Sequence, residues 1–313
     1  MGADVLVRNT WYVAGLSGEF VPMRLVGQII AERPVVLWRG KDGRMVAFDD
    51  RCVHKRMPLS RGRFLSDGTL ECAYHGLCYD ASGQCVRVPA HPDGHIPPGA
   101  RLRPVPLVEQ DGLVWVWPGD PAKSGEAVPP RIPEMASDAW DTRDVGGAMA
   151  VPANTILLIE NLLDITHFYP LHDGNIGDVE NSRIPIQVEE GVAPDGNRYV
   201  GTVREVEDYR QPPYLAEYMG YDRVDRHHTH HLLSPGVTRV QMRVWPAGRK
   251  GEAAAERGYM IIHTHTPVDR RNHVWHLVIN MPKGMVCKSD PTRPAIYNFV
   301  ETFPQVIAED RWA

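Results

Sequence analysis

The sequence predicts an α+β chain of two domains, the first entirely β and the second a mixture of strands and helices. Its length of 313 residues favours about two domains of ~150 residues each. Short β-like runs fill the first third, and a segment with helical periodicity begins at Asn154. Prolines, glycines and charges are dense between Pro118 and Pro133, which indicates a linker. We therefore expect domains at residues 1–120 and 121–313.

The β-like runs of the first domain include a hairpin. Residues 34–39 and 44–48 flank the segment Gly-Lys-Asp-Gly, and an Asp-Gly dipeptide is a strong hairpin signal. Residues 112–117 read Gly-Leu-Val-Trp-Val-Trp, and the alternation of a strand places both tryptophans on one face. We expect these tryptophans to lie in the core.

The second domain begins with a predicted helix and continues with strands. Residues 154–168 carry apolar side chains at helical spacing, and Pro170 should end or kink this helix. Residues from 298 to the C-terminus look helical again, with an interruption at Pro304. Strand-like runs lie between these helices, at residues 199–206, 237–244, 259–265 and 273–279.

Composition narrows the classes of function. The net charge of −5 gives no basic excess of the kind that nucleic-acid binding requires, and we find no apolar run of ~18 residues that would span a membrane. An acid near the N-terminus argues against a signal peptide. Five cysteines is an odd count, which suits a reducing cytoplasm and predicts free thiols at Cys78, Cys85 and Cys287.

Four residues form a strong metal-ligand pattern. Cys52 and His54 are followed after 17 residues by Cys72 and His75. Two thiolates and two imidazoles suit a [2Fe–2S] cluster, with the cysteines on one iron and the histidines on the other. Neutral imidazoles leave the cluster with less negative charge, so it is easier to reduce. A structural zinc site is the alternative, but zinc fingers usually pair Cys with Cys and His with His.

A second, weaker pattern contains Asp164, His167 and His172. Two histidines and one carboxylate can hold a mononuclear iron and leave positions open for O₂ and substrate. The histidines are five residues apart, or ~140° around an ideal helix, and a kink at Pro170 could bring them together. Asp164 shares a helix face with His167, so we expect it to support that histidine and a distant carboxylate to be the third ligand.

Two further groups of histidines have a simpler interpretation. In a strand, residues 227–231 place His227 and His231 on one face and His228 and His230 on the other. One face is expected to line a substrate cavity or an interface, and a third metal site is not expected. His263 and His265 are interpreted in the same way, either as strand residues or with one of them contacting substrate.

The first pattern, continued by Gly76, strongly resembles the Rieske motif. High-potential Rieske proteins join their two ligand loops by a disulfide, whereas Met57 and Tyr74 stand at the matching places here. This favours the low-potential Rieske domains of oxygenases. Many of those oxygenases have Trp after the His-Gly pair; Leu77 is found there in demethylase-like relatives.

The second pattern resembles the iron site of the Rieske non-haem iron oxygenases, over residues 160–172. The resemblance implies a catalytic domain of antiparallel sheet and helices, of the helix-grip type. It also implies a third iron ligand in an acidic helix near the C-terminus, which we assign to Asp310 with Glu309 as the alternative. Asn161 resembles a polar residue near the iron. Relatives continue past this aspartate, so we expect the protein to extend beyond Ala313.

The resemblance implies the terminal oxygenase of an O₂- and NAD(P)H-dependent system with a [2Fe–2S] cluster and Fe(II). A ferredoxin, a reductase or both would supply electrons, and a small, aromatic or heterocyclic substrate would be hydroxylated or O-/N-demethylated. It also implies a homotrimer in which His75 of one subunit faces Asp164 of the next, which passes electrons to the iron. Aromatic cis-dihydroxylation is the first alternative. A Rieske electron carrier is the second, although it needs only about 120 residues.

Overall fold

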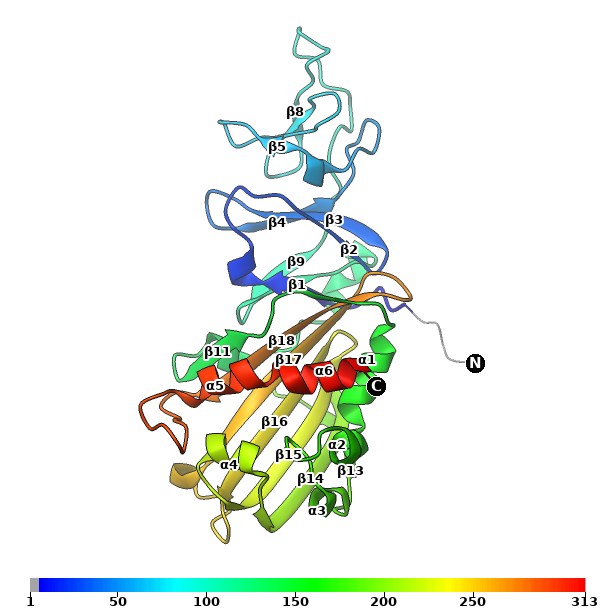
Figure 1. Cartoon of the computed structure of the whole chain (residues 1–313). Coiled ribbons are helices and arrows are strands. Elements are labelled where there is room, and N and C mark those ends of the chain that lie inside the picture. The colour runs from blue at the N-terminus through cyan, green and yellow to red at the C-terminus, as the bar shows by residue number, and fades with distance from the viewer. Residues whose placement is uncertain (1–5, 313) are drawn as a thin grey trace. The chain divides into compact units, whose positions relative to one another are not determined.

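The computed structural model describes residues 6–312 and contains two compact units (Figure 1). The first unit ends at Pro129 and includes residues 266–273, and the second begins at Pro130. The boundary is later than the expected residue 120 because the linker packs on the first unit. Trp11 Nε1 donates to the carbonyl of Ala127 over 2.9 Å, and Gln110 Nε2 donates to that of Pro129 over 3.2 Å. Residues 1–5, which contributed to the signal-peptide argument, lie outside the described residues.

The first unit is built from three small antiparallel sheets, which agrees with the all-β expectation. The predicted hairpin is confirmed: residues 35–39 pair with 45–49, and Gly43 takes a left-handed conformation with φ 83° in its turn. Trp115 and Trp117 are buried, as expected. The sheets are β1-β10-β9 (Tyr12–Leu16, Leu113–Val116, Leu107–Gln110), β2-β3-β4 (Val26–Ile30, Arg33–Arg39, Met45–Asp49) and β5-β6-β7-β8 (Arg63–Phe64, Leu70–Glu71, Cys78–Tyr79, Cys85–Arg87). The described part of this unit, from residue 6 on, also contains the 3₁₀ turns η1 (Ser17–Glu19), η2 (Leu59–Arg61) and η3 (Pro121–Glu126).

The second unit is built on one eight-stranded sheet, and its strand pairings are antiparallel. All four predicted strand runs are present, and each is longer than expected. The order is β11-β18-β17-β16-β15-β14-β13, with β12 also paired to β18. The strands are β11 (Trp140–Asp144), β12 (Met149–Val151), β13 (Gln187–Val192), β14 (Arg198–Arg210), β15 (Arg223–Ser234), β16 (Val237–Pro246), β17 (Arg257–Pro267) and β18 (His273–Pro282).

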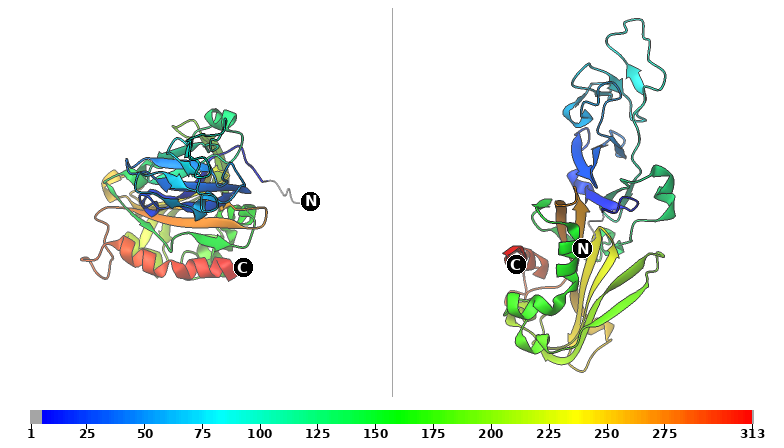
Figure 2. Two further views of the ribbon diagram at one scale, coloured as in Figure 1. Left: turned by 90° about the horizontal axis from the view of Figure 1, so that it is seen from above. Right: turned by 90° about the vertical axis from the view of Figure 1, so that its right-hand side faces the viewer.

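Helices of the second unit gather on one face of this sheet, as Figure 2 shows for α1, α5 and α6. Pro304 separates α5 from α6, as predicted, because a proline is tolerated in the first turn of a new helix. Among the described residues, no helix combines the length and apolar character needed to cross a membrane. The helices are α1 (Thr155–Leu163), α2 (Phe168–Leu171), α3 (Val179–Ser182), α4 (Pro213–Met219), α5 (Ala295–Thr302) and α6 (Pro304–Trp312), with the 3₁₀ turns η4 (Pro133–Ala136), η5 (Ile165–His167) and η6 (Ala253–Ala255).

An aromatic core holds the C-terminal helices against the sheet. Phe299 of α5 is fully buried, and its ring centroid lies 5.0 Å from that of Tyr259 on β17 and 5.1 Å from that of Tyr218 on α4. Phe303 continues the cluster at 5.2 Å from Phe299. Complete burial of one such ring contributes roughly 1.5–3 kcal/mol. This packing fixes the position of α6, the helix that carries Asp310.

Candidate metal centres

A break in the predicted helix brings His167 and His172 together. The helix expected over 154–168 instead stops at Leu163, because Asp164 leaves helical conformation (φ −88°, ψ 86°) and its carboxylate accepts the backbone N–H of Thr166. A short 3₁₀ turn and α2 follow. The prediction that Pro170 ends or kinks the helix was wrong: the break precedes it, and Pro170 lies within the first turn of α2, where a missing N–H costs nothing.

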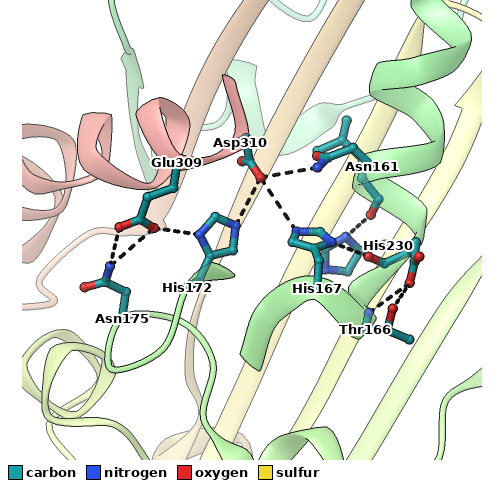
Figure 3. Close-up of polar contacts among 10 residues, drawn as sticks. Asn161, Thr166, His167, His172, Asn175, His230, Glu309 and Asp310 are labelled. Atoms are coloured by element: carbon teal, nitrogen blue, oxygen red, sulfur yellow. Dashed lines mark hydrogen bonds and ion pairs between the residues drawn. The ribbon is translucent and has the colours of Figure 1, made fainter. Parts of the chain in front are cut away.

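Asp310, the second of the two carboxylates of α6, completes a group with His167 and His172. Asp310 Oδ1 lies 3.1 Å from Nε2 of His172 and 3.7 Å from Nε2 of His167 (Figure 3). One potential ligand atom from each of these three residues lies within 4.8 Å of the other two. The side chain of His172 is buried, and those of His167 and Asp310 are about one-fifth exposed. Three potential ligands therefore converge on one point, at the side of the sheet covered by α6.

The other ring nitrogens are occupied by acceptors that fix the tautomers. Nδ1 of His172 lies 2.7 Å from Oε2 of Glu309, and Nδ1 of His167 contacts the backbone carbonyl of Asp164 (Figure 3). Asn175 Nδ2 donates to Glu309 over 3.2 Å and orients that carboxylate. A histidine that donates through Nδ1 presents the lone pair of Nε2, and this arrangement is typical of metal-binding histidines. The donor set therefore fits a divalent iron.

Two expectations for the surrounding residues can now be refined. Asp164 does support His167, but through its backbone carbonyl, while its exposed carboxylate caps the following turn. Asn161 Nδ2 donates to Oδ1 of Asp310 over 3.3 Å, so this amide lies at the centre. Glu309, which the sequence left as an alternative ligand, is engaged with His172 on the side away from Asp310. The sequence did not predict that Glu309 would hydrogen-bond to a metal-site histidine, although its position next to Asp310 was the available signal.

The surroundings shift the pKa values of His167 and His172 in opposite directions. Burial lowers the pKa of His167, and the charge of Asp310 offsets this only in part. Burial also acts to lower the pKa of His172, but the hydrogen bonds and charges of Asp310 and Glu309 outweigh it and raise the pKa. For Asp164, hydrogen bonds from the Thr166 hydroxyl and N–H lower the pKa. Protons therefore compete with a metal at His172 more strongly than at His167.

An apolar cavity adjoins the three residues. The space inside it that is open to water-sized molecules is about 40 Å³, and the empty volume reaches about 490 Å³ when the open mouth is counted. Its lining is mainly apolar and includes Phe168, Ile261, Trp275, Leu277 and Phe303, together with the metal-site side chains. The apolar lining suits a small organic molecule placed directly beside a metal.

Three of the strand histidines also line the cavity: His228, His230 and His263. The predicted alternation is therefore confirmed, since His227 and His231 instead lie near glutamates. His230 donates through Nδ1 to the carbonyl of Leu162 over 2.6 Å, and its Nε2 lies 3.1 Å from Nε2 of His228. Burial lowers the pKa of His230 to about 3, so the ring is neutral and accepts a hydrogen bond from His228.

The cluster residues lie on two loops with the same backbone pattern. The N–H of Cys52 donates to the carbonyl of Met57 over 2.9 Å, and that of Cys72 donates to the carbonyl of Leu77 over 2.9 Å. The fourth residue after each cysteine is left-handed, with φ 56° in the first loop and 70° in the second. Each loop thus turns tightly around its cysteine and presents one histidine beside it.

The four potential cluster ligands differ in exposure. Cys52 and Cys72 are buried, whereas His54 and His75 are exposed with ring centroids 4.5 Å apart. Burial raises the pKa of the Cys72 thiol, while backbone N–H groups oppose this, and Sγ of Cys52 lies 3.1 Å from the Tyr79 hydroxyl. Buried thiols of this kind ionise when a metal binds them. The chemistry therefore fits a cluster with a buried thiolate end and an exposed imidazole end.

The other cysteines match their prediction. Cys78, Cys85 and Cys287 are buried free thiols, and Cys52 and Cys72 are also unbridged.

The two units thus define an iron–sulfur protein with a second, mononuclear metal centre. The Rieske [2Fe–2S] domain model matches residues 10–106, and the model of the vanillate O-demethylase oxygenase C-terminal domain matches residues 151–311. The chain therefore belongs to the vanillate O-demethylase oxygenase family and carries a Rieske domain. This confirms the resemblance, the α+β fold class and the two cofactors that the sequence predicted.

Individual relatives agree with this assignment. The oxygenase component of dicamba O-demethylase from Stenotrophomonas maltophilia is 42% identical over 169 residues, which cover 54% of this chain and 48% of that protein. A putative toluene-4-sulfonate monooxygenase iron–sulfur subunit from Comamonas testosteroni is 40% identical over 173 residues, covering 55% and 48%. These matched segments span about half the length of the curated relatives.

Structural comparison extends over nearly the whole chain. Dicamba monooxygenase bound to 3,6-dichlorosalicylic acid superposes with a TM-score of 0.82 at 28% identity, covering 97% of this chain and 85% of that one. A further crystal structure of dicamba monooxygenase contains non-haem iron and dicamba, and it matches with a TM-score of 0.72 at 29% identity, covering 92% of this chain and 80% of that chain.

Proposed function

We propose that this chain is the terminal oxygenase of a Rieske system, which uses O₂ and NAD(P)H to monooxygenate a small aromatic or heterocyclic substrate. The reaction would be hydroxylation of a C–H bond, which becomes demethylation when the carbon is attached to O or N. One oxygen atom enters the substrate and the other leaves as water. The observation that carries the proposal is the convergence of His167, His172 and Asp310 beside an apolar cavity in a chain with a Rieske domain.

The residues divide between two cofactors. Cys52, Cys72, His54 and His75 would hold the [2Fe–2S] cluster, which supplies single electrons. His167, His172 and Asp310 would hold Fe(II), which supplies O₂ chemistry at its remaining open positions.

The protein groups around the iron have positioning roles. Glu309 and the Asp164 carbonyl keep the two histidines in the metal-binding tautomer, and Asn161 orients Asp310. Phe168 and Trp275 line the cavity and would exclude water around a planar ring. Productive placement of the reacting carbon is the main contribution expected from such a cavity.

We also propose that electrons enter near Asp164 from the cluster of a neighbouring subunit in a homotrimer. Three observations support this. The Asp164 carboxylate is exposed, its carbonyl contacts His167, and both residues border a surface hollow beside α1. Leu157, on the same helix α1, exposes 58% of its surface. A reductase, alone or with a ferredoxin, would recharge the cluster in the cytoplasm.

Metal analysis followed by turnover tests the proposal. The purified chain should contain about three irons and two sulfides, whereas an electron carrier with only the cluster would contain two irons. A screen of aromatic ethers, N-alkyl compounds and aryl acids should then show substrate-dependent O₂ and NADH consumption with a surrogate reductase. Product analysis separates alcohols and demethylated products from cis-diols. Two irons per chain, or no product from an iron-replete enzyme across the screen, would contradict the proposal.

A further inference from the structure

A row of three charged residues and one cysteine crosses the four-stranded sheet of the first unit. The register places Arg63 opposite Glu71, Glu71 opposite Cys78, and Cys78 opposite Arg87. Directly opposite residues on neighbouring strands have adjacent side chains on one face of a sheet. The four side chains can therefore interact one after another across β5, β6, β7 and β8.

This row lies at both ends of the second cluster loop. Glu71 comes directly before Cys72, and Cys78 comes three residues after His75. Strand β6 therefore leads into the loop that carries two of the proposed cluster ligands, and β7 leads out of it. Interactions within the row act on the backbone of this loop.

The Cys78 thiol is held from two sides. Nε and Nη2 of Arg87 donate to its sulfur over 3.2 Å and 2.9 Å, and the sulfur lies 3.3 Å from the carbonyl oxygen of Gly76, to which the thiol donates. The cysteine is only 1% exposed. A thiol is ordinarily a weak donor, but two N–H groups of a guanidinium on its sulfur polarise the S–H bond and strengthen its donation to Gly76.

The carbonyl that receives this hydrogen bond belongs to a constrained turn. Gly76 has a left-handed backbone with φ 70°, and its N–H donates to the carbonyl of Cys72 over 3.1 Å. A Cβ at this position would lie 3.0 Å from Cγ of Pro89, so the turn is also closely packed. The thiol of Cys78 thus fixes the peptide group that follows His75.

The first cluster loop is built differently at the matching position. Cys78 stands six residues after Cys72, whereas Pro58 stands six residues after Cys52. A proline side chain has no hydrogen-bond donor. Bracing by a thiol and a guanidinium is therefore specific to the second loop, which carries His75.

The row also brings positive charge to this loop. The Glu71 carboxylate lies 2.7 Å from Nε of Arg63 and 3.5 Å from Nη2 of Arg87, so two cations share one anion. Reduction adds an electron to a cluster, and a nearby positive charge stabilises the reduced form. The Arg87 side chain is 54% exposed, so water screens part of this effect.

We propose that Cys78 and Arg87 are positioning residues of the iron–sulfur centre. Arg87 polarises the thiol, the thiol holds the Gly76 carbonyl, and this fixes the backbone next to His75. The guanidinium charge also raises the reduction potential of the cluster. The proposal concerns how the cluster is held and how readily it accepts an electron, so it goes beyond the proposed reaction and does not depend on the substrate.

An anaerobic redox titration of the full chain tests the charge effect, with neither substrate nor reductase present. At a fixed potential near the wild-type midpoint, Arg87→Met should lower the ratio of reduced to oxidised cluster at least ~3-fold. Arg87→Lys keeps the charge and should stay close to the wild type. Arg44→Met is the matched control, because Arg44 is exposed in the hairpin of the same unit and pairs with Asp42; it should leave the ratio unchanged. An unchanged ratio in Arg87→Met, or an equal shift in Arg44→Met, would overturn the charge effect.

The rate of cluster loss tests the thiol contact. Cys78→Ala removes the donor to Gly76, so the visible absorption of the cluster should decay at least ~3-fold faster in the presence of a chelator. Cys78→Ser retains a hydroxyl that can donate to Gly76 and accept from Arg87, and it should decay like the wild type. Equal decay of the Ser and Ala variants, or failure of both to hold a cluster, would overturn the brace. Failure of the oxygenase function would appear separately, as missing product from an enzyme whose cluster responds as described.

Discussion

The two metal centres are assembled from the chain in different ways. The four cluster residues lie between Cys52 and His75, 23 positions apart, on two loops that repeat one backbone pattern. The residues of the mononuclear site span the 143 positions from His167 to Asp310 and meet only because the C-terminal helix packs on the sheet. The cluster site is therefore a local structure, whereas the iron site depends on the tertiary fold of the second unit.

The largest expected effect is the loss of the mononuclear iron without any loss of the cluster. His167→Ala removes one of three proposed ligands to the iron, so we expect loss of that iron and a fall in turnover of at least ~10³-fold. The cluster loops lie in the other unit, so the visible absorption of the cluster should be unchanged. Iron analysis, absorption spectra and product formation measure these effects.

His227→Ala is a matched control for this variant, because His227 lies on the opposite face of β15 from the cavity. It should keep both the iron and the activity. Loss of the cluster spectrum in His167→Ala would show that the centres are not independently assembled, and this would break the comparison.

A smaller effect is expected at Asp164, where we propose that electrons pass from the cluster to the iron. Asp164→Asn keeps the side-chain acceptor that caps η5 and the carbonyl that contacts His167, but it removes the charge. We expect full iron content with turnover reduced roughly 10–100-fold, the usual scale for residues behind a metal ligand. Rapid-mixing measurement of cluster oxidation should locate the slow step.

Glu160→Gln controls for surface charge, because Glu160 borders the same hollow as Asp164. It should leave cluster oxidation unchanged. Equal rates in Asp164→Asn and the wild type would count against an electron path through this residue.

An effect on metal affinity alone is expected at Glu309. Glu309→Gln retains an acceptor for Nδ1 of His172 but loses the charge that strengthens this ligand, so iron affinity should fall about 10-fold or more. Titration with Fe(II) under anaerobic conditions measures this. Glu301→Gln, on the exposed side of α5 and paired with Arg293, should bind iron like the wild type. If Glu309→Gln and Glu301→Gln bind iron equally well, a neutral hydrogen-bond acceptor at Nδ1 of His172 is sufficient for full iron affinity, and the charge of Glu309 makes no contribution.

Local features of the fold were predictable from the sequence. The hairpin of β3 and β4, the alternation of His227 to His231 and the restart at Pro304 depend on interactions between near neighbours. The end of α1 was not predicted, because two local signals competed there. Pro170 is a strong breaker by type, but the side chain of Asp164 captures the Thr166 N–H earlier in the chain.

Features that depend on distant contacts were harder to predict. Asp310 came from family resemblance, since nothing local relates it to His167, and its role as a ligand stays a prediction with a consistent geometry. Glu309 was predicted only as the alternative ligand, and its contact with Nδ1 of His172 depends on the packing of α6. The burial of Arg204 and Arg226 was not predicted either, because arginines are mostly exposed in folded proteins.

The smallest predicted effect compares the stability of the two units directly. Asn154 caps α1 by accepting the N–H of Ile156 over 2.9 Å, and Asp120 caps η3 by accepting that of Ala122 over 3.1 Å. Loss of such a cap costs typically ~1 kcal/mol, which corresponds to a decrease in Tm of about 2–4 °C for a domain of this size. Asn154→Ala should shift the transition reported by iron release, and Asp120→Ala the one reported by cluster absorbance. Separate shifts would establish that the units unfold independently. If either variant shifts both transitions equally, the two units unfold as one cooperative structure. The cluster site would then be local in its backbone geometry but not in its stability.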